Sequence, residues 1–232
     1  MHYIPLAWPF FLILFVLFSF VVVLLEIGVL EYAYESMGVD RRYMFVLLVG
    51  SLLGSYINIP AAELPAEHIY TERIVSFFGM QYVVPQVLTE PKTIIAVNLG
   101  GAVIPTILSF YLMLKHRIYV RSAIAVVIVA AFVHLMARPI PGVGIAEPTF
   151  MPFLVTAGVV LVLSRKYAAP LAYIAGSLGT LIGADLMNLG RIRGLGAPVA
   201  SIGGAGTFDG IFLTGILAVL LASLLTGGRR AA

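Results

Sequence analysis

Long apolar segments constrain the fold of this chain more than any other feature. Of its 232 residues, 61% are hydrophobic and only 11% are charged. An α-helix needs about 20 consecutive apolar residues to cross the hydrocarbon core of a bilayer. We therefore expect an all-α fold, a polytopic transmembrane helix bundle in which residues 1–232 form one domain of a multi-pass protein of the cell membrane. The predicted spans are Trp8–Leu30, Arg42–Ile59, Thr93–Leu114, Tyr119–Ala137, Phe150–Ser164, Pro170–Leu189 and Gly210–Leu225.

Lysine and arginine predict the orientation of these spans. Both residues favour cytoplasmic loops, and they are more numerous in the connections that become cytoplasmic when the N-terminus lies outside. We therefore expect about seven spans in an N-outside, C-inside arrangement. Because the fifth segment is short and the second is marginally apolar, six or eight spans are also compatible with the sequence. Function is expected on the outer face, where the connections are rich in proline, glycine and polar groups; they include residues 58–68, 134–150 and 183–210.

The longest connection, residues 60–92, contains the sequence IVSFFGMQYVVPQV from Ile74 to Val87. This stretch is β-branched and aromatic, with Gly79 near its middle. Such a pattern predicts a short interfacial hairpin or a re-entrant segment over the outer mouth of the bundle. A short additional span is the alternative.

Several classes of function are disfavoured by what the sequence lacks. It has no cysteine, so disulfides, thiolate metal sites and thiol nucleophiles are excluded. Its net charge of +3 is dispersed along the chain, which predicts no nucleic-acid partner. It contains no phosphate-binding glycine loop, no HExxH and no GxSxG elbow. We therefore expect no cofactor and no metal ion, and the composition implies membrane lipids as partners.

The stretch GADLMNLGRIRGLGAPVASIGGAGTFDG, from Gly183 to Gly210, connects the last two predicted spans and has an aspartate near each end. Asp185 lies at the carboxyl end of its helix, where the helix dipole disfavours an anion. A carboxylate at membrane depth is rare and typically functional. Asp209 begins the next span. Because both helix ends lie on one side of the membrane, we expect the two carboxyls to meet and share a proton, which makes them candidate catalytic residues.

Structural roles are the alternatives for both aspartates. Asp209 could cap the first turn of its own helix, and Asp185 could pair with Arg191 or Arg193. Asn188 lies three residues after Asp185 on the same helix face, so we expect it to orient one carboxyl.

Glycine and proline mark two of the predicted helices. Gly176, Gly179 and Gly183 recur near helical spacing, which predicts close packing of helix backbones. The third span contains NLGGAVIPT, which begins at Asn98 and has Pro105 in its interior. We expect either a kink that fits the bundle or a broken helix whose freed carbonyls contribute to an ion or substrate site.

Other polar side chains accompany the outer connections. His134 lies near the outer end of the fourth span, with Arg138 four residues later on the same helix face. Glu63 and Glu147 approach from two of the loops. No two histidines have ligand spacing, so a metal site is disfavoured, and a hydrogen bond to the backbone is the alternative role for His134. The candidate substrate- or ion-binding residues are Asn188, Asn98, His134, Arg138, Glu63, Arg191 and Arg193.

Three segments carry a resemblance to known proteins. ARPIPGVGI (Ala137 to Ile145), GTLIGADLMNLG (Gly179 to Gly190) and GAPVASIGGAGTFDGIFLTGILAVLLA (Gly196 to Ala222) resemble an uncharacterised family of small polytopic membrane proteins of archaea and bacteria. This likeness implies a membrane protein and supplies no activity. A weaker likeness is to the presenilin and signal-peptide-peptidase group of intramembrane aspartyl proteases, which place one aspartate late in one span and another early in the next.

Two functional hypotheses use the same acids. In the first, Asp185 and Asp209 form the centre of a membrane-embedded aspartyl-type hydrolase that cleaves a membrane peptide or a comparable substrate. In the second, they bind a proton or a small cation in a carrier or channel, beside a broken third span. A non-catalytic scaffold or lipid-binding protein is a further alternative. Close carboxyls favour hydrolysis, whereas a cavity that runs past Asn98 and Pro105 favours transport.

Overall fold

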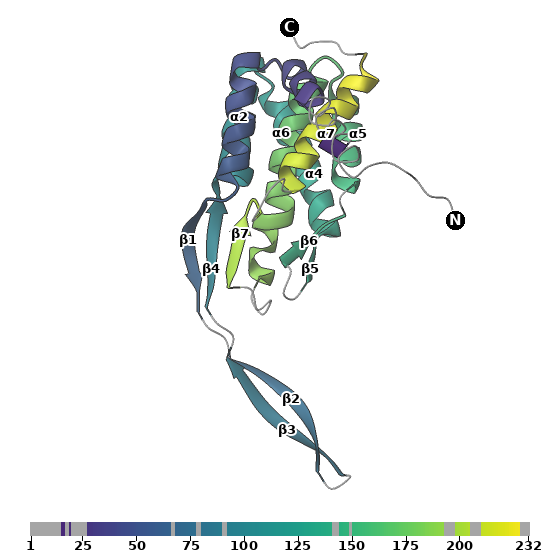
Figure 1. Cartoon of the computed structure of the whole chain (residues 1–232). Helices are drawn as coiled ribbons and strands as arrows, with labels where there is room; N and C mark the ends of the chain where they lie inside the picture. The colour runs from purple at the N-terminus through teal and green to yellow at the C-terminus, as the bar shows by residue number, and fades with distance from the viewer. Residues whose placement is uncertain are drawn as a thin grey trace, which may run out of the picture.

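A computed structural model gives the arrangement of the helices and strands. It describes residues 15–16, 19, 27–65, 68–77, 80–89, 92–140, 144–148, 150–192, 198–204 and 210–227. A bundle of helices forms the main body, and the sheets lie toward one end of it (Figure 1). The main helices are α2 (Arg41–Gly54), α3 (Ile104–His116), α4 (Tyr119–Met136), α5 (Met151–Leu163), α6 (Ala168–Thr180) and α7 (Gly210–Leu225).

Local sequence sets the ends of several helices. The Asp40 side chain accepts a hydrogen bond from the Arg42 amide and caps the start of α2. Pro105 and Pro152 lie in the first turns of α3 and α5, where a helix needs no amide donor. Arg117 takes a left-handed conformation and ends α3. The left-handed conformation of Arg117 therefore sets the point where α3 ends and the short connection to α4 begins.

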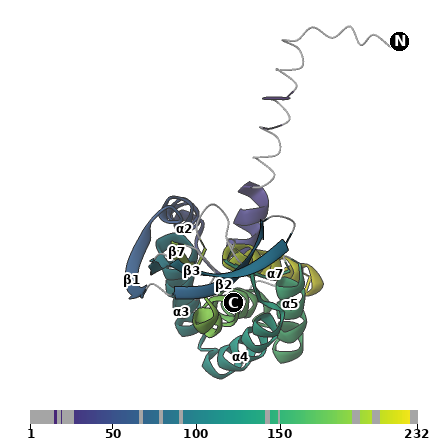
Figure 2. The same ribbon diagram turned by 90° about the horizontal axis from the view of Figure 1, so that it is seen from below.

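Helix α6 lies at the centre of the bundle. All of its residues from Ala168 to Thr180 are buried, and it contacts α3, α4, α5 and α7. Viewed from below, the other main helices are arranged around the periphery (Figure 2). Two short helical segments extend α6 beyond Thr180: a π-helix, Leu181–Asp185, and a 3-10 helix, Leu186–Arg191. The central, buried position of α6 is the one expected for a helix that is apolar on every side.

Glycines allow the neighbours of α6 to approach closely, as predicted. A Cβ placed on Gly176 would lie 3.1 Å from Gly215 Cα in α7. A Cβ on Gly179 would lie 2.6 Å from Val129 Cγ1 in α4, and one on Gly183 would collide with the Ala130 carbonyl oxygen. The three glycines therefore pack α6 against two different helices.

Three helices within the described residues are long and apolar enough to cross a membrane, which indicates a membrane protein. They are 99–116, 119–136 and 168–191. The helices 42–54, 151–163 and 210–225 are apolar but shorter. The first predicted span, Trp8–Leu30, lies largely outside the described residues. The seven spans and their orientation therefore stay predictions.

The expectation of an all-α fold is incomplete, because the structure contains strands as well as helices. The strands β1 (Asn58–Leu64), β4 (Thr93–Asn98) and β7 (Val199–Ile202) form a sheet in the order β1-β4-β7. Strand β4 pairs antiparallel with β1 and parallel with β7. Its sequence TIIAVN is rich in β-branched residues, which favour strands. The predicted second and third spans are therefore shorter than expected, since their ends become β1 and β4.

Two hairpins complete the β-structure. Strands β2 (His68–Phe77) and β3 (Met80–Thr89) pair antiparallel along their whole length. The long connection thus forms a hairpin, as predicted, but the hairpin projects away from the bundle (Figure 1) and does not cover its mouth, and its position at the membrane interface stays a prediction. A second, short hairpin joins β5 (Arg138–Ile140) to β6 (Gly144–Ala146).

Gly183→Ala tests the packing of the central helix. The added methyl group meets the Ala130 backbone and Val133, so we expect the free energy of unfolding to fall by about 1–3 kcal/mol. Gly158→Ala in α5 is the control, because no atom lies within 4 Å of the position that its Cβ would take. Unfolding of both variants in mixed micelles measures the difference. Equal stability of the two variants would contradict the close approach of α4 and α6.

Candidate functional site: an acidic pocket at the end of helix α6

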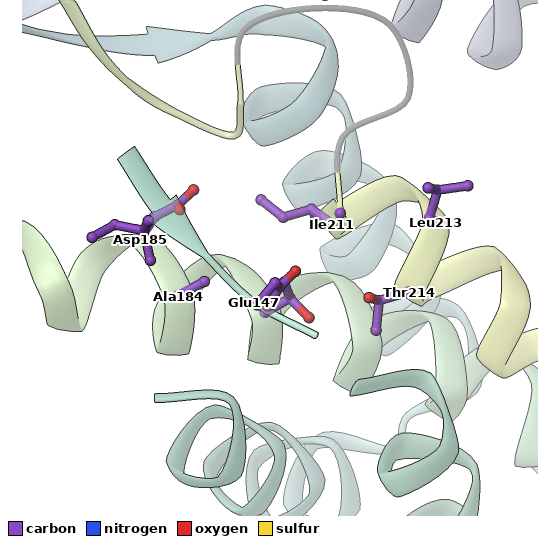
Figure 3. A pocket seen from close by; sticks show the side chains of 9 residues that line it. Glu147, Ala184, Asp185, Ile211, Leu213 and Thr214 are labelled. Carbon is purple, nitrogen blue, oxygen red and sulfur yellow. The ribbon is translucent and has the colours of Figure 1, made fainter. Parts of the chain in front are cut away.

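A pocket of about 250 Å³ opens where the extension of α6 meets the start of α7. Both β6 and the residue after it contribute to its wall. Figure 3 shows Asp185 and Glu147 lining this space from different elements, with Thr214 from α7 farther along it. The described residues that line it are Ile145, Glu147, Thr180, Ala184, Asp185, Gly210, Ile211, Leu213 and Thr214. Polar oxygens and apolar side chains thus share the pocket.

Asp185 is the predicted site residue that the structure places in this pocket. It is the last residue of the π-helix that extends α6. Its Oδ2 accepts a 2.7 Å hydrogen bond from the Gly203 amide, in the turn after β7. Gly203 has a φ of +87°, and a Cβ there would lie 2.6 Å from the Ala102 amide nitrogen. This hydrogen bond connects the Asp185 carboxyl to a tightly packed turn and restrains its orientation.

Glu147 is a second pocket carboxylate, and it was not among the predicted site residues. It follows β6, and its Oε1 lies against Gly210, where a Cβ would collide with it. Gly210 is the first residue of α7. The amino end of a helix favours an anion because its first amides point outward. The sequence placed it among the polar side chains of the outer connections, but its proline- and glycine-rich loop did not distinguish it as a site residue.

Thr180 contributes a buried hydroxyl to the same pocket. Its side chain is 1% exposed, and its Oγ1 has no hydrogen-bond partner among the residues that the structure describes. Buried threonines in helices commonly bond to a carbonyl in the preceding turn, as Thr156 does with the Pro152 oxygen at 2.7 Å. Thr180 therefore lines the pocket and carries a buried hydroxyl without a hydrogen-bond partner in the described residues.

Asp209 and Arg193 lie outside the described residues. Gly210, which follows Asp209 directly in the sequence, lines the pocket together with Asp185. The meeting of Asp185 and Asp209 therefore stays a prediction.

Asn188 and Arg191 lie at the helix end beyond the pocket. Asn188 is fully buried, and its Nδ2 donates to the Gly183 oxygen at 3.0 Å and to the Ala184 oxygen at 2.9 Å. Arg191 Nη1 donates to Asn188 Oδ1 at 3.2 Å. These bonds satisfy carbonyls that an ending helix leaves without amide partners. The amide of Asn188 thereby closes the helix, and its predicted role in orienting a carboxyl is untested.

His134 and Arg138 do not share a helix face, contrary to the prediction. Helix α4 ends at Met136, and the exposed Arg138 begins β5, where it pairs with Ala146. Nδ1 of His134 is shielded from solvent and has no hydrogen-bond partner within the described parts of the chain. Neither residue lines the pocket.

Asn98 begins a helix and does not line the pocket. It is fully buried, and its Oδ1 accepts from the Gly101 amide at 2.8 Å, which caps the π-helix Leu99–Val103. Its Nδ2 donates to the Ser55 oxygen at 2.7 Å and to Asn58 Oδ1 at 3.0 Å. The predicted interruption of the third span is the start of a helix, with Pro105 in the first turn of α3.

Glu63 lies on β1, away from the pocket. Its carboxylate is exposed and lies 3.9 Å from the exposed ammonium of Lys92. A solvent-exposed ion pair of this length contributes little to stability. No cluster of three or more histidine, cysteine, aspartate or glutamate residues suited to a metal ion occurs in the described residues.

The fold and the pocket together define a helical membrane protein with an acidic site at one end of its bundle. The chain belongs to the family described as Protein of unknown function (DUF1614), whose sequence profile matches residues 52–221. No curated protein and no solved structure matches the chain. The matched region contains all the described residues that line the pocket, and Asp209 also falls within it.

Asn98→Asp separates a structural role from ion binding. The carboxylate can still accept from the Gly101 amide, but it cannot donate to Ser55 or Asn58. We expect a loss of about 3 kcal/mol in the free energy of unfolding, measured in mixed micelles. A variant with unchanged stability and tighter cation binding would instead assign Asn98 to an ion site.

Proposed function

We propose that the protein is a membrane-embedded aspartyl-type hydrolase in which Asp185 and Asp209 act as a pair. One observation carries the proposal: Asp185 and Gly210 line the same pocket. Adjacent Cα atoms are about 3.8 Å apart, so we expect Asp209, which directly precedes Gly210 in the sequence, to lie near the pocket wall. The hydrogen bond from the Gly203 amide holds Asp185 in one orientation, which general acid–base chemistry requires.

The proposed mechanism divides acid and base roles between the two carboxyls. Two close carboxyls share one proton, since both cannot ionise without strong repulsion. The ionised group accepts a proton from water as that water attacks the substrate carbonyl, and the protonated group donates a hydrogen bond to the carbonyl oxygen. Collapse of the tetrahedral intermediate breaks the C–N bond, with a proton passing to the leaving amine.

A proton- or cation-coupled carrier is the second candidate. Among the residues that the structure describes, the polar side chains that line the pocket carry carboxyls and hydroxyls: Glu147, Asp185, Thr180 and Thr214. Such oxygen donors suit a proton or a small cation. Asn98 is not among the lining residues, so the pocket gives no support to a pathway along the third predicted span.

Asp185→Asn and Asp209→Asn test the hydrolase directly. The full chain is reconstituted in vesicles with a library of membrane peptides, and cleavage is followed by mass spectrometry. We expect each substitution to lower the rate by at least about 10³-fold, because the paired carboxyls act as a unit. Glu63→Gln is the matched control, since it makes the same chemical change at an exposed carboxylate outside the pocket.

A flux assay on the same vesicles distinguishes the alternatives. Loss of proton or cation flux in both aspartate variants, without any peptide cleavage by the wild type, would replace the hydrolase by a carrier. Indifference of both activities to both substitutions would exclude the pair as a working site and favour a scaffold or lipid-binding role.

A further inference from the structure

We propose that the pocket beside Asp185 binds a protonated primary amine on a short alkyl arm. The Glu147 carboxylate is its counter-ion, and the Thr180 hydroxyl accepts a hydrogen bond from one of its N–H groups. This inference rests on the proposed hydrolase, because the amine is then a recognition group of the substrate. It assigns Glu147 and Thr180 to substrate binding and keeps them apart from the acid–base chemistry of the aspartates.

The buried hydroxyl of Thr180 points to a ligand that carries hydrogen-bond donors. Its Oγ1 has no partner within the described residues although its side chain is 1% exposed. An unpartnered buried hydroxyl costs free energy, which a ligand in the pocket recovers by hydrogen bonding. An ammonium group has three N–H donors and no acceptor. It can therefore satisfy the hydroxyl and a carboxylate at the same time.

Glu147 supplies the complementary charge. Its Oε1 lies against Gly210 at the start of α7, and its Oε2 is shielded from solvent. A carboxylate with little access to water favours a nearby cation over a neutral ligand. Because this carboxylate lies at the wall of the pocket, a cation that enters the pocket meets it there.

The remaining wall favours an alkyl chain over a bare metal ion. Ile145, Ala184, Ile211 and Leu213 give the pocket an apolar side. Sites for complete small molecules span about 300–1,000 Å³, so a pocket of about 250 Å³ suits one substituent of a larger substrate. A single metal ion would leave much of this space unfilled and the apolar side chains without contacts.

Two substrates carry this chemistry: a peptide with a lysine side chain and a lipid with an ethanolamine headgroup. The two differ in the length and polarity of the arm, because lysine has a flexible four-carbon stem. Butylammonium represents the lysine arm, and ethanolammonium represents the lipid headgroup. Butanol is the neutral control of similar shape.

Calorimetric titration of the full chain in detergent micelles tests the proposal. We expect butylammonium or ethanolammonium to bind the wild type at least about tenfold more tightly than butanol. Glu147→Gln and Thr180→Val should each weaken amine binding by about tenfold or more. Tighter binding of butylammonium identifies a peptide lysine as the source, and tighter binding of ethanolammonium identifies a lipid headgroup.

Matched substitutions control for general effects. Thr156→Val removes a buried threonine hydroxyl from α5, outside the pocket, and Glu63→Gln neutralises an exposed carboxylate. Both should leave amine binding unchanged. Equal binding of butanol and the amines, or undiminished amine binding in a folded Glu147→Gln variant, would overturn the proposal. Thermal unfolding of each variant establishes that it is folded.

These experiments can reject the amine site and the hydrolase separately. Amine binding that depends on Glu147, together with no cleavage by the wild type, would retain the amine site and reject the hydrolase. Cleavage that depends on Asp185 and Asp209, together with no amine binding, would retain the hydrolase and reject the amine site.

Discussion

Close backbone packing around helix α6 is the constraint on which the rest of the structure depends. Gly176 and Gly179 bring α6 close to α7 and α4, since a Cβ would lie 3.1 Å from Gly215 Cα at the first position and 2.6 Å from Val129 Cγ1 at the second. The helix is buried along its whole length, from Ala168 to Thr180. Such packing resists displacement, because protein interiors contain few voids. The far end of α6, which contributes Thr180 to the pocket, and the π-helix after it, which contributes Asp185, are consequently held in one position.

A series of close contacts connects this end of the bundle to the sheet. Asp185 accepts the Gly203 amide, and Gly203 packs against the backbone of the helical segment that Asn98 caps. That segment packs through Gly100 against α2. The position of the Asp185 carboxylate therefore depends on elements distant in sequence. A functional group supported in this way is preorganised, as acid–base chemistry and ligand binding both require.

The sequence predicted the features that arise from local patterns. Apolar segments marked the helices, the glycines of α6 marked its packing, and the β-branched stretch after residue 60 marked a hairpin. It did not predict the pairing of β4 with β7, since strands about a hundred residues apart meet only through the tertiary fold. For the same reason Glu147 was not identified as a pocket residue. Asn98 was interpreted as a possible ligand because a capping amide and a ligand amide look alike in sequence.

The proximity of Asp185 and Asp209 is the central claim, and disulfide trapping tests it most directly. The chain has no cysteine, so Asp185→Cys and Asp209→Cys can be combined without background, and Arg191 between them lets trypsin separate the two peptides. A disulfide requires Cα atoms about 4.4–6.8 Å apart. Oxidation should leave the two tryptic peptides joined by a disulfide. The control combines Glu63→Cys with Ile94→Cys, two positions that are paired across β1 and β4, and its peptides should also remain joined. Linkage of the control pair without linkage of the first pair would contradict the account.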